Sequence, residues 1–96
     1  MDITYFKPGK ELTFNSVVAI RNELIKSLEA CEALVFCLDL TEVTHCDSAG
    51  LALLIEAKKL CEHNNKQFKV LGIPETTQSL SKFCGVNDFL ETAQVS

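Results

Sequence analysis

Several classes of protein are excluded by what this 96-residue chain lacks. No apolar run approaches the roughly 20 residues that a membrane-spanning helix needs, and the N-terminus has no basic segment followed by the apolar core of a secretory signal. Lysine and arginine are scattered and the formal net charge is −4, so a basic face for nucleic acid is missing. We therefore expect a cytoplasmic protein with no membrane span and no nucleic-acid partner.

The cysteines lack the spacing of a structural site. Their number is five, which is odd, and no CxxC pair occurs, so neither a disulfide framework nor a zinc site is expected. Four of them stand where the pattern calls for an apolar residue and are predicted to be small core side chains: Cys31, Cys37, Cys61 and Cys84. Cys46 lies in a predicted loop, and its environment stays open.

The length suits one domain, residues 1–96, with a single core between a sheet and a layer of helices. Two short segments with a strand pattern begin the chain, Ile3 to Lys7 and Glu11 to Phe14, and Pro8-Gly9 between them is a strong turn signal. This pattern predicts two strands that pair as an antiparallel hairpin.

The middle of the chain alternates between helical and strand patterns. Apolar residues repeat at helical spacing from Val17 to about Cys31, and Leu34 to Leu40 is an almost continuous apolar run, typical of a strand buried on both faces. Gln67 to Ile73 predicts another strand. Strands separated by helices imply parallel pairing through crossovers. We therefore expect an α/β fold with a mixed sheet of about four strands and helices mainly on one face.

The C-terminal part predicts a third helix. Pro74 suits its first turn, and Gly85 suits its end. Its inward stripe is expected to contain Leu80, Phe83 and Cys84. Asn87 to Ala93 is expected to add one further helical turn.

The most informative segment is Cys46 to Leu54, which follows the buried strand and opens an amphipathic helix. Asp47 is a strong N-cap residue, whose carboxylate can accept hydrogen bonds from the free amides of the first helical turn. Ser48 is therefore expected at an exposed helix start.

Two sides of this helix are apolar. With about 100° of rotation per residue, one stripe is wide enough to cover a sheet and contains Gly50, Leu53, Leu54, Ala57, Leu60 and Cys61. The other side gathers Ser48, Leu51, Ala52 and Ile55, bordered by Lys58, Lys59 and Glu62. Contiguous apolar surface usually marks a docking site, although single apolar surface residues are common and Asp47 and Ser48 also suit a simple capping role. The predicted docking face consists of Asp47, Ser48, Leu51, Ala52 and Ile55.

Catalysis and metal binding have little support. His45, Cys46 and Asp47 are the residue types of a nucleophilic triad, but consecutive side chains do not easily converge as nucleophile, base and orienting group. Cys61 and His63 are two positions apart on a helix and point in different directions, which disfavours a metal pair. No glycine-rich loop precedes a lysine, as nucleotide binding would need. We expect no enzyme activity, no metal and no cofactor.

The run Asp47-Ser48-Ala49-Gly50-Leu51, between an apolar strand and an amphipathic helix, resembles the STAS domain of sulfate transporters and anti-sigma-factor antagonists. The resemblance covers essentially the whole chain. Within the family, the segment Glu11 to Val17 is most similar to the stand-alone STAS subunit of the Mla phospholipid transport system, the MlaB type. Anti-sigma antagonists more often carry an acidic residue where this chain has Thr13.

This resemblance implies a subunit without chemistry of its own. STAS subunits of the MlaB type bind and support the cytoplasmic, MlaF-like ATPase of an ABC transporter, which moves phospholipid between the two membranes of Gram-negative bacteria and maintains the lipid asymmetry of the outer membrane. Such a chain would be peripheral to the inner membrane through its partner. Ser48 takes the position of a small hydroxyl residue that lies at that contact. The competing hypothesis is an anti-sigma-factor antagonist that a kinase switches by phosphorylating Ser48.

Overall fold

The computed structural model describes residues 2–85, which form three helices and five short strands. Their order is β1 (Ile3–Phe6), β2 (Glu11–Leu12), α1 (Val17–Glu29), β3 (Val35–Asp39), β4 (His45–Cys46), α2 (Ser48–His63), β5 (Gln67–Leu71) and α3 (Glu75–Phe83). The predicted turn at Asn87 to Ala93 lies outside the described residues.

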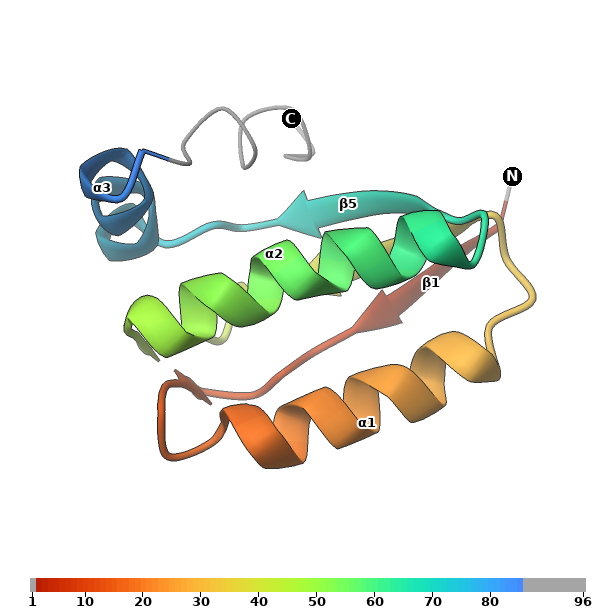
Figure 1. The fold of residues 1–96 in the computed structure, drawn as a ribbon, viewed down its shortest axis with the longest axis horizontal. Helices are drawn as coiled ribbons and strands as arrows, with labels where there is room; N and C mark the ends of the chain where they lie inside the picture. Colours follow the sequence, from red (N-terminus) through yellow and green to blue (C-terminus); the bar gives the residue numbers. More distant parts are fainter. Residues whose placement is uncertain (1, 86–96) are drawn as a thin grey trace.

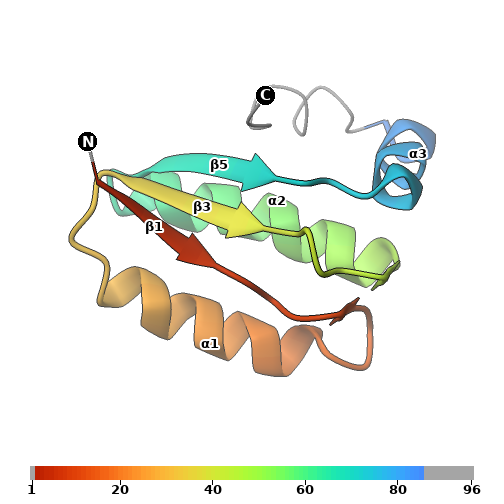
Figure 2. The same cartoon turned by 180° about the vertical axis from the view of Figure 1, so that it is seen from behind.

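Helices α1 and α2 lie side by side on one face of the sheet formed by β1, β3 and β5 (Figure 1). Seen from behind, the same strands lie in front of both helices (Figure 2). Helix α3 lies beyond the end of β5 and packs against α2. The α/β fold with helices mainly on one face is thus confirmed.

All strand pairs among residues 2–85 are parallel. The main sheet has the order β1-β3-β5, and a separate pair joins β2 to β4. The predicted antiparallel hairpin is therefore wrong, because β1 and β2 each pair with a later strand, and the sheet is parallel with three strands rather than mixed with about four. Two short strands alone cannot bury an apolar face. Beside β3, strand β1 instead places Phe6 against Phe36, with ring centroids 6.3 Å apart.

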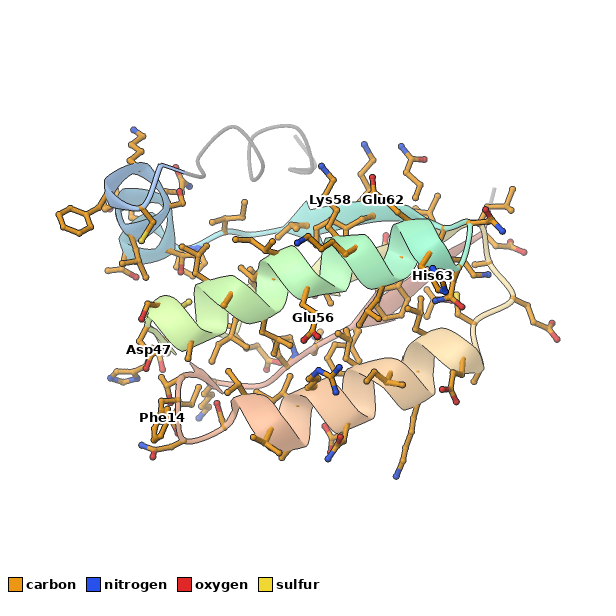
Figure 3. The ribbon with its side chains drawn as sticks, viewed as in Figure 1. Phe14, Asp47, Glu56, Lys58, Glu62 and His63 are labelled. Carbon is orange, nitrogen blue, oxygen red and sulfur yellow. The ribbon has the colours of Figure 1, made fainter. Side chains whose placement is uncertain are left out.

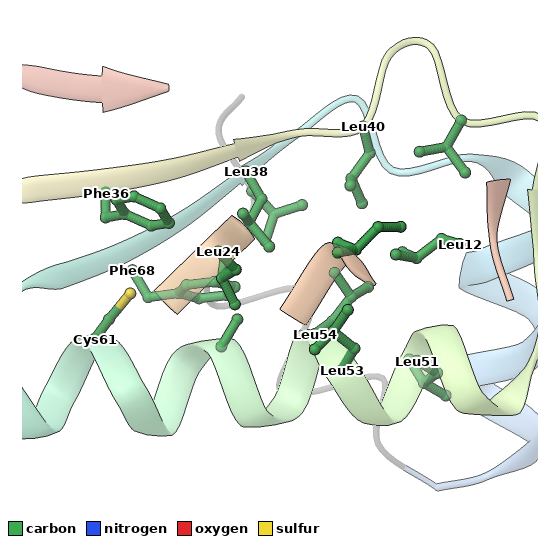
Figure 4. Close-up of a cluster of buried hydrophobic side chains, with 14 of the residues drawn as sticks. Leu12, Leu24, Phe36, Leu38, Leu40, Leu51, Leu53, Leu54, Cys61 and Phe68 are labelled. Carbon is green, nitrogen blue, oxygen red and sulfur yellow. The ribbon is translucent and has the colours of Figure 1, made fainter. Parts of the chain in front are cut away.

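The core lies between the main sheet and helices α1 and α2, and Figure 4 shows its centre. Its most deeply buried side chains come from every layer: Leu12, Leu24, Phe36, Leu40, Leu54, Ala57, Cys61 and Val70. Val35 and Cys37 are also buried, although they alternate with Phe36 and Leu38 along β3. Strand β3 is thus buried on both faces, as its continuous apolar run predicted.

Helix α3 buries side chains that the apolar pattern did not predict. Thr77 and Ser81 are its buried residues and Leu80 is half-buried, whereas Phe83 is 90% exposed and Cys84 is exposed. The inward positions expected for Phe83 and Cys84 are therefore wrong. Thr77 and Ser81 are small enough for α3 to pack against α2, and the Ser81 hydroxyl donates a hydrogen bond to the Gln78 carbonyl at 2.7 Å.

Candidate partner-binding site at the start of helix α2

Asp47 ties the β2–α1 turn to the start of α2. Its Oδ1 accepts a hydrogen bond from the Gly50 amide at 3.1 Å, and its Oδ2 accepts one from the Phe14 amide at 3.0 Å. The Asp47 amide donates to the Leu12 carbonyl at 3.3 Å. The predicted N-cap is thus confirmed, and the same carboxylate also holds Phe14 at this end of the molecule (Figure 3).

The same hydrogen bonds keep the Asp47 carboxyl group ionised. The amides of Phe14 and Gly50, in that order, lower its pKa below the ordinary value, because both donate to the charged form. The helix start therefore carries a fixed negative charge at neutral pH.

Gly50 lies where α2 touches the backbone of β2. A Cβ atom at this position would be 2.0 Å from the Leu12 carbonyl oxygen and 3.0 Å from Cys46 Sγ. Leu12 comes this close because β2 pairs with β4, directly before α2. The glycine in the Asp47–Leu51 run is therefore required by a close approach of two backbones.

Ser48, the first residue of α2, is exposed, and its hydroxyl has no hydrogen-bond partner among residues 2–85. Ala52, Ile55 and Lys59 follow it at helical spacing and form one row with it along the outer side of α2. Ala52 and Lys59 are exposed, and Ile55 is half-buried. The structure thus brings Ser48, Ala52 and Ile55 of the predicted docking face together on the surface, next to Asp47.

Leu51 does not belong to this surface. It is only 3% exposed and is part of the core cluster (Figure 4), so its expected exposure is wrong. The helical spacing predicted a single covered face of α2, toward the sheet. Helix α3 and strands β2 and β4 also contact α2, so a wider arc of α2 is shielded from water than the main sheet alone would cover.

A groove of about 460 Å³ runs between α1 and α2. Its lining residues are Val17, Val18 and Arg21 of α1 together with Ala49, Ala52, Leu53, Ile55, Glu56 and Lys59 of α2. The small side chains of Ala49 and Ala52 leave this space open. We call this feature the α1–α2 groove.

Helix α1 adds apolar surface that the sequence analysis missed. Val18 is 72% exposed, and Phe14 in the preceding turn is 77% exposed. Both lie outside the buried stripe of α1, which consists of Ile20, Leu24 and Leu28. Because Phe14 and Val18 are apolar but do not belong to that stripe, the sequence already suggested exposed apolar surface here. Only the packing of α1 beside α2 places Val18 at the groove.

Three charged side chains line the groove. Arg21 Nε lies 2.8 Å from Glu56 Oε1, which links α1 to α2, and this contact raises the pKa of Arg21. Lys59 forms no ion pair within the described part of the chain. The groove therefore contains one neutralised pair and one further cation.

The residues around Asp47 do not converge as a catalytic site. His45 Nδ1 lies 3.0 Å from the Thr44 hydroxyl, and both Asp47 oxygens are engaged by backbone amides. Burial raises the pKa of the Cys46 thiol, which disfavours the reactive thiolate. Residues 2–85 contain no group of three or more His, Cys, Asp or Glu side chains that could hold a metal ion. Within the same range, no helix is both long and apolar enough to cross a membrane.

Comparison with known proteins gives one family model and a curated relative. The model of the STAS domain matches residues 1–95. Over 73 residues the chain is 27% identical to an anti-sigma-B factor antagonist of Listeria monocytogenes serovar 1/2a. That match covers 76% of this chain and 64% of the relative, slightly under two thirds of its length.

Two solved structures share the fold. A sulfate transporter family protein from Wolinella succinogenes matches with a TM-score of 0.74 at 19% identity, over 96% of this chain and 75% of that chain. The anti-sigma factor antagonist SpoIIAA in its unphosphorylated form matches with a TM-score of 0.74 at 15% identity, over 98% and 78%. At these identities the likeness shows the fold alone. Because the family model spans residues 1–95, this chain belongs to the STAS domain family.

Proposed function

We propose that this chain is a non-catalytic STAS subunit that binds and supports the ATPase of a phospholipid ABC transporter of the Mla type. STAS domains act in protein–protein interactions. The observation that carries the proposal is the exposed row Ser48, Ala52 and Ile55 beside the α1–α2 groove, an apolar surface with an available hydroxyl at its end. The proposal implies a position on the cytoplasmic side of the inner membrane, where such an ATPase works.

The chemistry of this surface suits docking. Val18, Ala52 and Ile55 gain when a partner's apolar side chains cover them, and the Ser48 hydroxyl can exchange a hydrogen bond with a polar group at the edge of the contact. The Asp47 hydrogen bonds and the Arg21–Glu56 pair already connect the segments that carry these side chains. A surface that is ordered before binding loses less conformational entropy on association.

The β2–α1 turn supports a transporter subunit over an anti-sigma antagonist. By the resemblance described above, Thr13 stands where the antagonists more often carry an acidic residue. Its hydroxyl donates a hydrogen bond to Glu11 Oε1 at 2.7 Å, so the residue serves the local structure of the turn.

A phosphorylation switch at Ser48 is the second candidate, and the anti-sigma antagonists among the relatives favour it. A phosphate on Ser48 would add up to about two negative charges beside the ionised Asp47. The Gly50 amide, which would otherwise stabilise an anion at the helix start, is already bound by Asp47. Phosphorylation would therefore repel a partner rather than reorganise the domain.

Co-purification tests the first candidate. The tagged chain is co-expressed with the phospholipid-transport ABC ATPase of the same organism, as wild type and as the Ser48→Glu variant. Ser48→Glu places a charge in the proposed contact and should reduce the yield of the ATPase at least about tenfold, which corresponds to about 1.4 kcal/mol. Ser79→Glu is the matched control, because Ser79 is exposed on α3 and does not line the α1–α2 groove. Normal folding of Ser48→Glu with an unchanged ATPase yield would reject the proposed contact.

Mass spectrometry separates the second candidate from the first. The chain is incubated with ATP and an anti-sigma kinase from the same organism, and phosphate is located by peptide mapping. A stoichiometric phosphate on Ser48 that is absent from the Ser48→Ala variant would establish the switch, and an unmodified Ser48 would eliminate it.

A further inference from the structure

The α1–α2 groove has the form of a seat for another helix. Helices α1 and α2 run in the same direction, and both begin at the Asp47 end of the molecule (Figure 1). Between them, Ala49 and Ala52 leave an open space that Val18 and Ile55 border with apolar surface. Packing between helices proceeds by fitting the side-chain ridges of one helix into the groove of its neighbours.

We propose that this groove binds one amphipathic helix of the partner protein, whose bulky apolar side chains cover Ala52 between Val18 and Ile55 and whose carboxylate pairs with Lys59. This inference rests on the proposed function, since it specifies the part of the partner that the surface receives. A helix laid into an apolar groove with anchors at i, i+4 and i+7 is a common mode of recognition between proteins.

Charge selects the orientation of that helix. The chain has a formal net charge of −4, yet the groove itself is left with a cation, because Arg21 and Glu56 neutralise each other and Lys59 remains. The Asp47 carboxylate lies at the opposite end of the row, roughly three helical turns from Lys59. A partner helix with an acidic residue toward Lys59 is therefore complementary. If that helix also carries a basic residue at its other end, it satisfies both positions in only one of its two directions, because the reversed helix brings like charges together at both ends.

Two synthetic helical peptides test the charge pairing directly. Both are stapled, blocked at their ends and carry leucines at i, i+4 and i+7. The first has glutamate at its N-terminal end and lysine at its C-terminal end, and the second has lysine at both ends, so that it meets Lys59 with a like charge in either direction. Binding is followed by NMR of the 15N-labelled full chain at low salt.

The first peptide, which can place glutamate at Lys59 and lysine toward Asp47, should bind wild type more tightly than the second and should shift the amide signals of Val18, Ala52 and Ile55. This peptide should bind wild type about tenfold more tightly than it binds the Lys59→Glu variant. Lys59→Glu should also reverse the order of the two peptides. Lys10→Glu makes the same charge change on an exposed residue outside the groove and should leave the order unchanged.

Three results would overturn the inference. In the first, neither peptide binds. In the second, both peptides bind equally well, to wild type and to the Lys59→Glu variant alike. In the third, the shifted amide signals lie around Ile3 and Tyr5. The last two side chains are exposed in strand β1, outside the groove.

Co-purification with the ATPase distinguishes a failure of this inference from a failure of the proposed function. Ala52→Trp fills the groove at an exposed position without altering Ser48. If the ATPase co-purifies equally with wild type and Ala52→Trp, the groove does not receive the partner and the inference is wrong, while the proposed function stands. If the ATPase never co-purifies but the first peptide occupies the groove as described, the proposed function is wrong and the groove still binds a helix of another partner.

Discussion

Leu51 and Ala52 are consecutive residues of helix α2, yet Leu51 is 3% exposed in the core and Ala52 lies in the exposed row beside the α1–α2 groove. Both are apolar and both lie within the first turns of the helix. Their difference comes from what lies beside them, because Leu51 packs into the core cluster whereas the groove beside Ala52 is open. The comparison shows that an apolar side chain becomes available surface only where no other element of the fold covers it.

The largest effect should come from placing a charge on the two sides of α2. Leu51→Asp buries an unpaired carboxylate in the core and should lower the free energy of unfolding by about 4 kcal/mol or more. Ala52→Asp places the same group in water and should cost less than about 1 kcal/mol, mostly as helix propensity. Urea denaturation followed by circular dichroism measures both. Equal losses of stability in the two variants would contradict the difference between the two sides.

A smaller loss should follow from Gly50→Ala. Alanine is the better helix former by about 1 kcal/mol, but its Cβ meets the Leu12 carbonyl oxygen. The clash should outweigh propensity and give a net destabilisation of about 2 kcal/mol in urea denaturation. Ser48→Ala changes an exposed side chain in the same helical turn and should stay within about 0.5 kcal/mol. A stabilised Gly50→Ala variant would mean that α2 does not begin against β2.

The smallest effect concerns the pH dependence of the exposed end of α2. The folded-state pKa of Asp47 is lowered, so the stabilisation from its carboxylate is fully present above the unfolded value of about 3.9 and is lost as pH falls through the lower folded value. The difference in melting temperature between wild type and Asp47→Asn should therefore be largest near neutral pH and shrink below about pH 4. The Phe14 amide, which donates to Asp47, should report the same titration by NMR. A Phe14 signal that is constant with pH would argue against this hydrogen bond.

Local signals predicted the elements of the fold well. The helix expected from Val17 to about Cys31 is observed as Val17–Glu29, and the strand expected from Leu34 to Leu40 is observed as Val35–Asp39. Asp47 caps α2 as expected. Caps and apolar spacing act over a few residues, so the sequence alone carries them.

The pairing of the strands and the burial of individual side chains were less predictable. The Pro8-Gly9 turn correctly separated two strands, but it contained no information on whether β1 would pair with β2 or with β3, a strand about thirty residues later. In the same way, Phe83 has an apolar side chain at the end of α3 but faces water, because α3 approaches α2 through the small residues Thr77 and Ser81.

The sequence by itself determined the α/β order of elements, the capped start of α2 and the exposed position of Ser48, since each follows from hydrogen bonding and apolar periodicity within a short segment. Only the tertiary structure decided that Leu51 is core, that Phe14 is held by Asp47 and that Val18 meets Ala52 and Ile55 at one groove. These relations depend on which surfaces of α1, α2 and α3 are brought together. Burial of the whole core determines which surfaces come together, and no single segment of the sequence contains enough information to predict it.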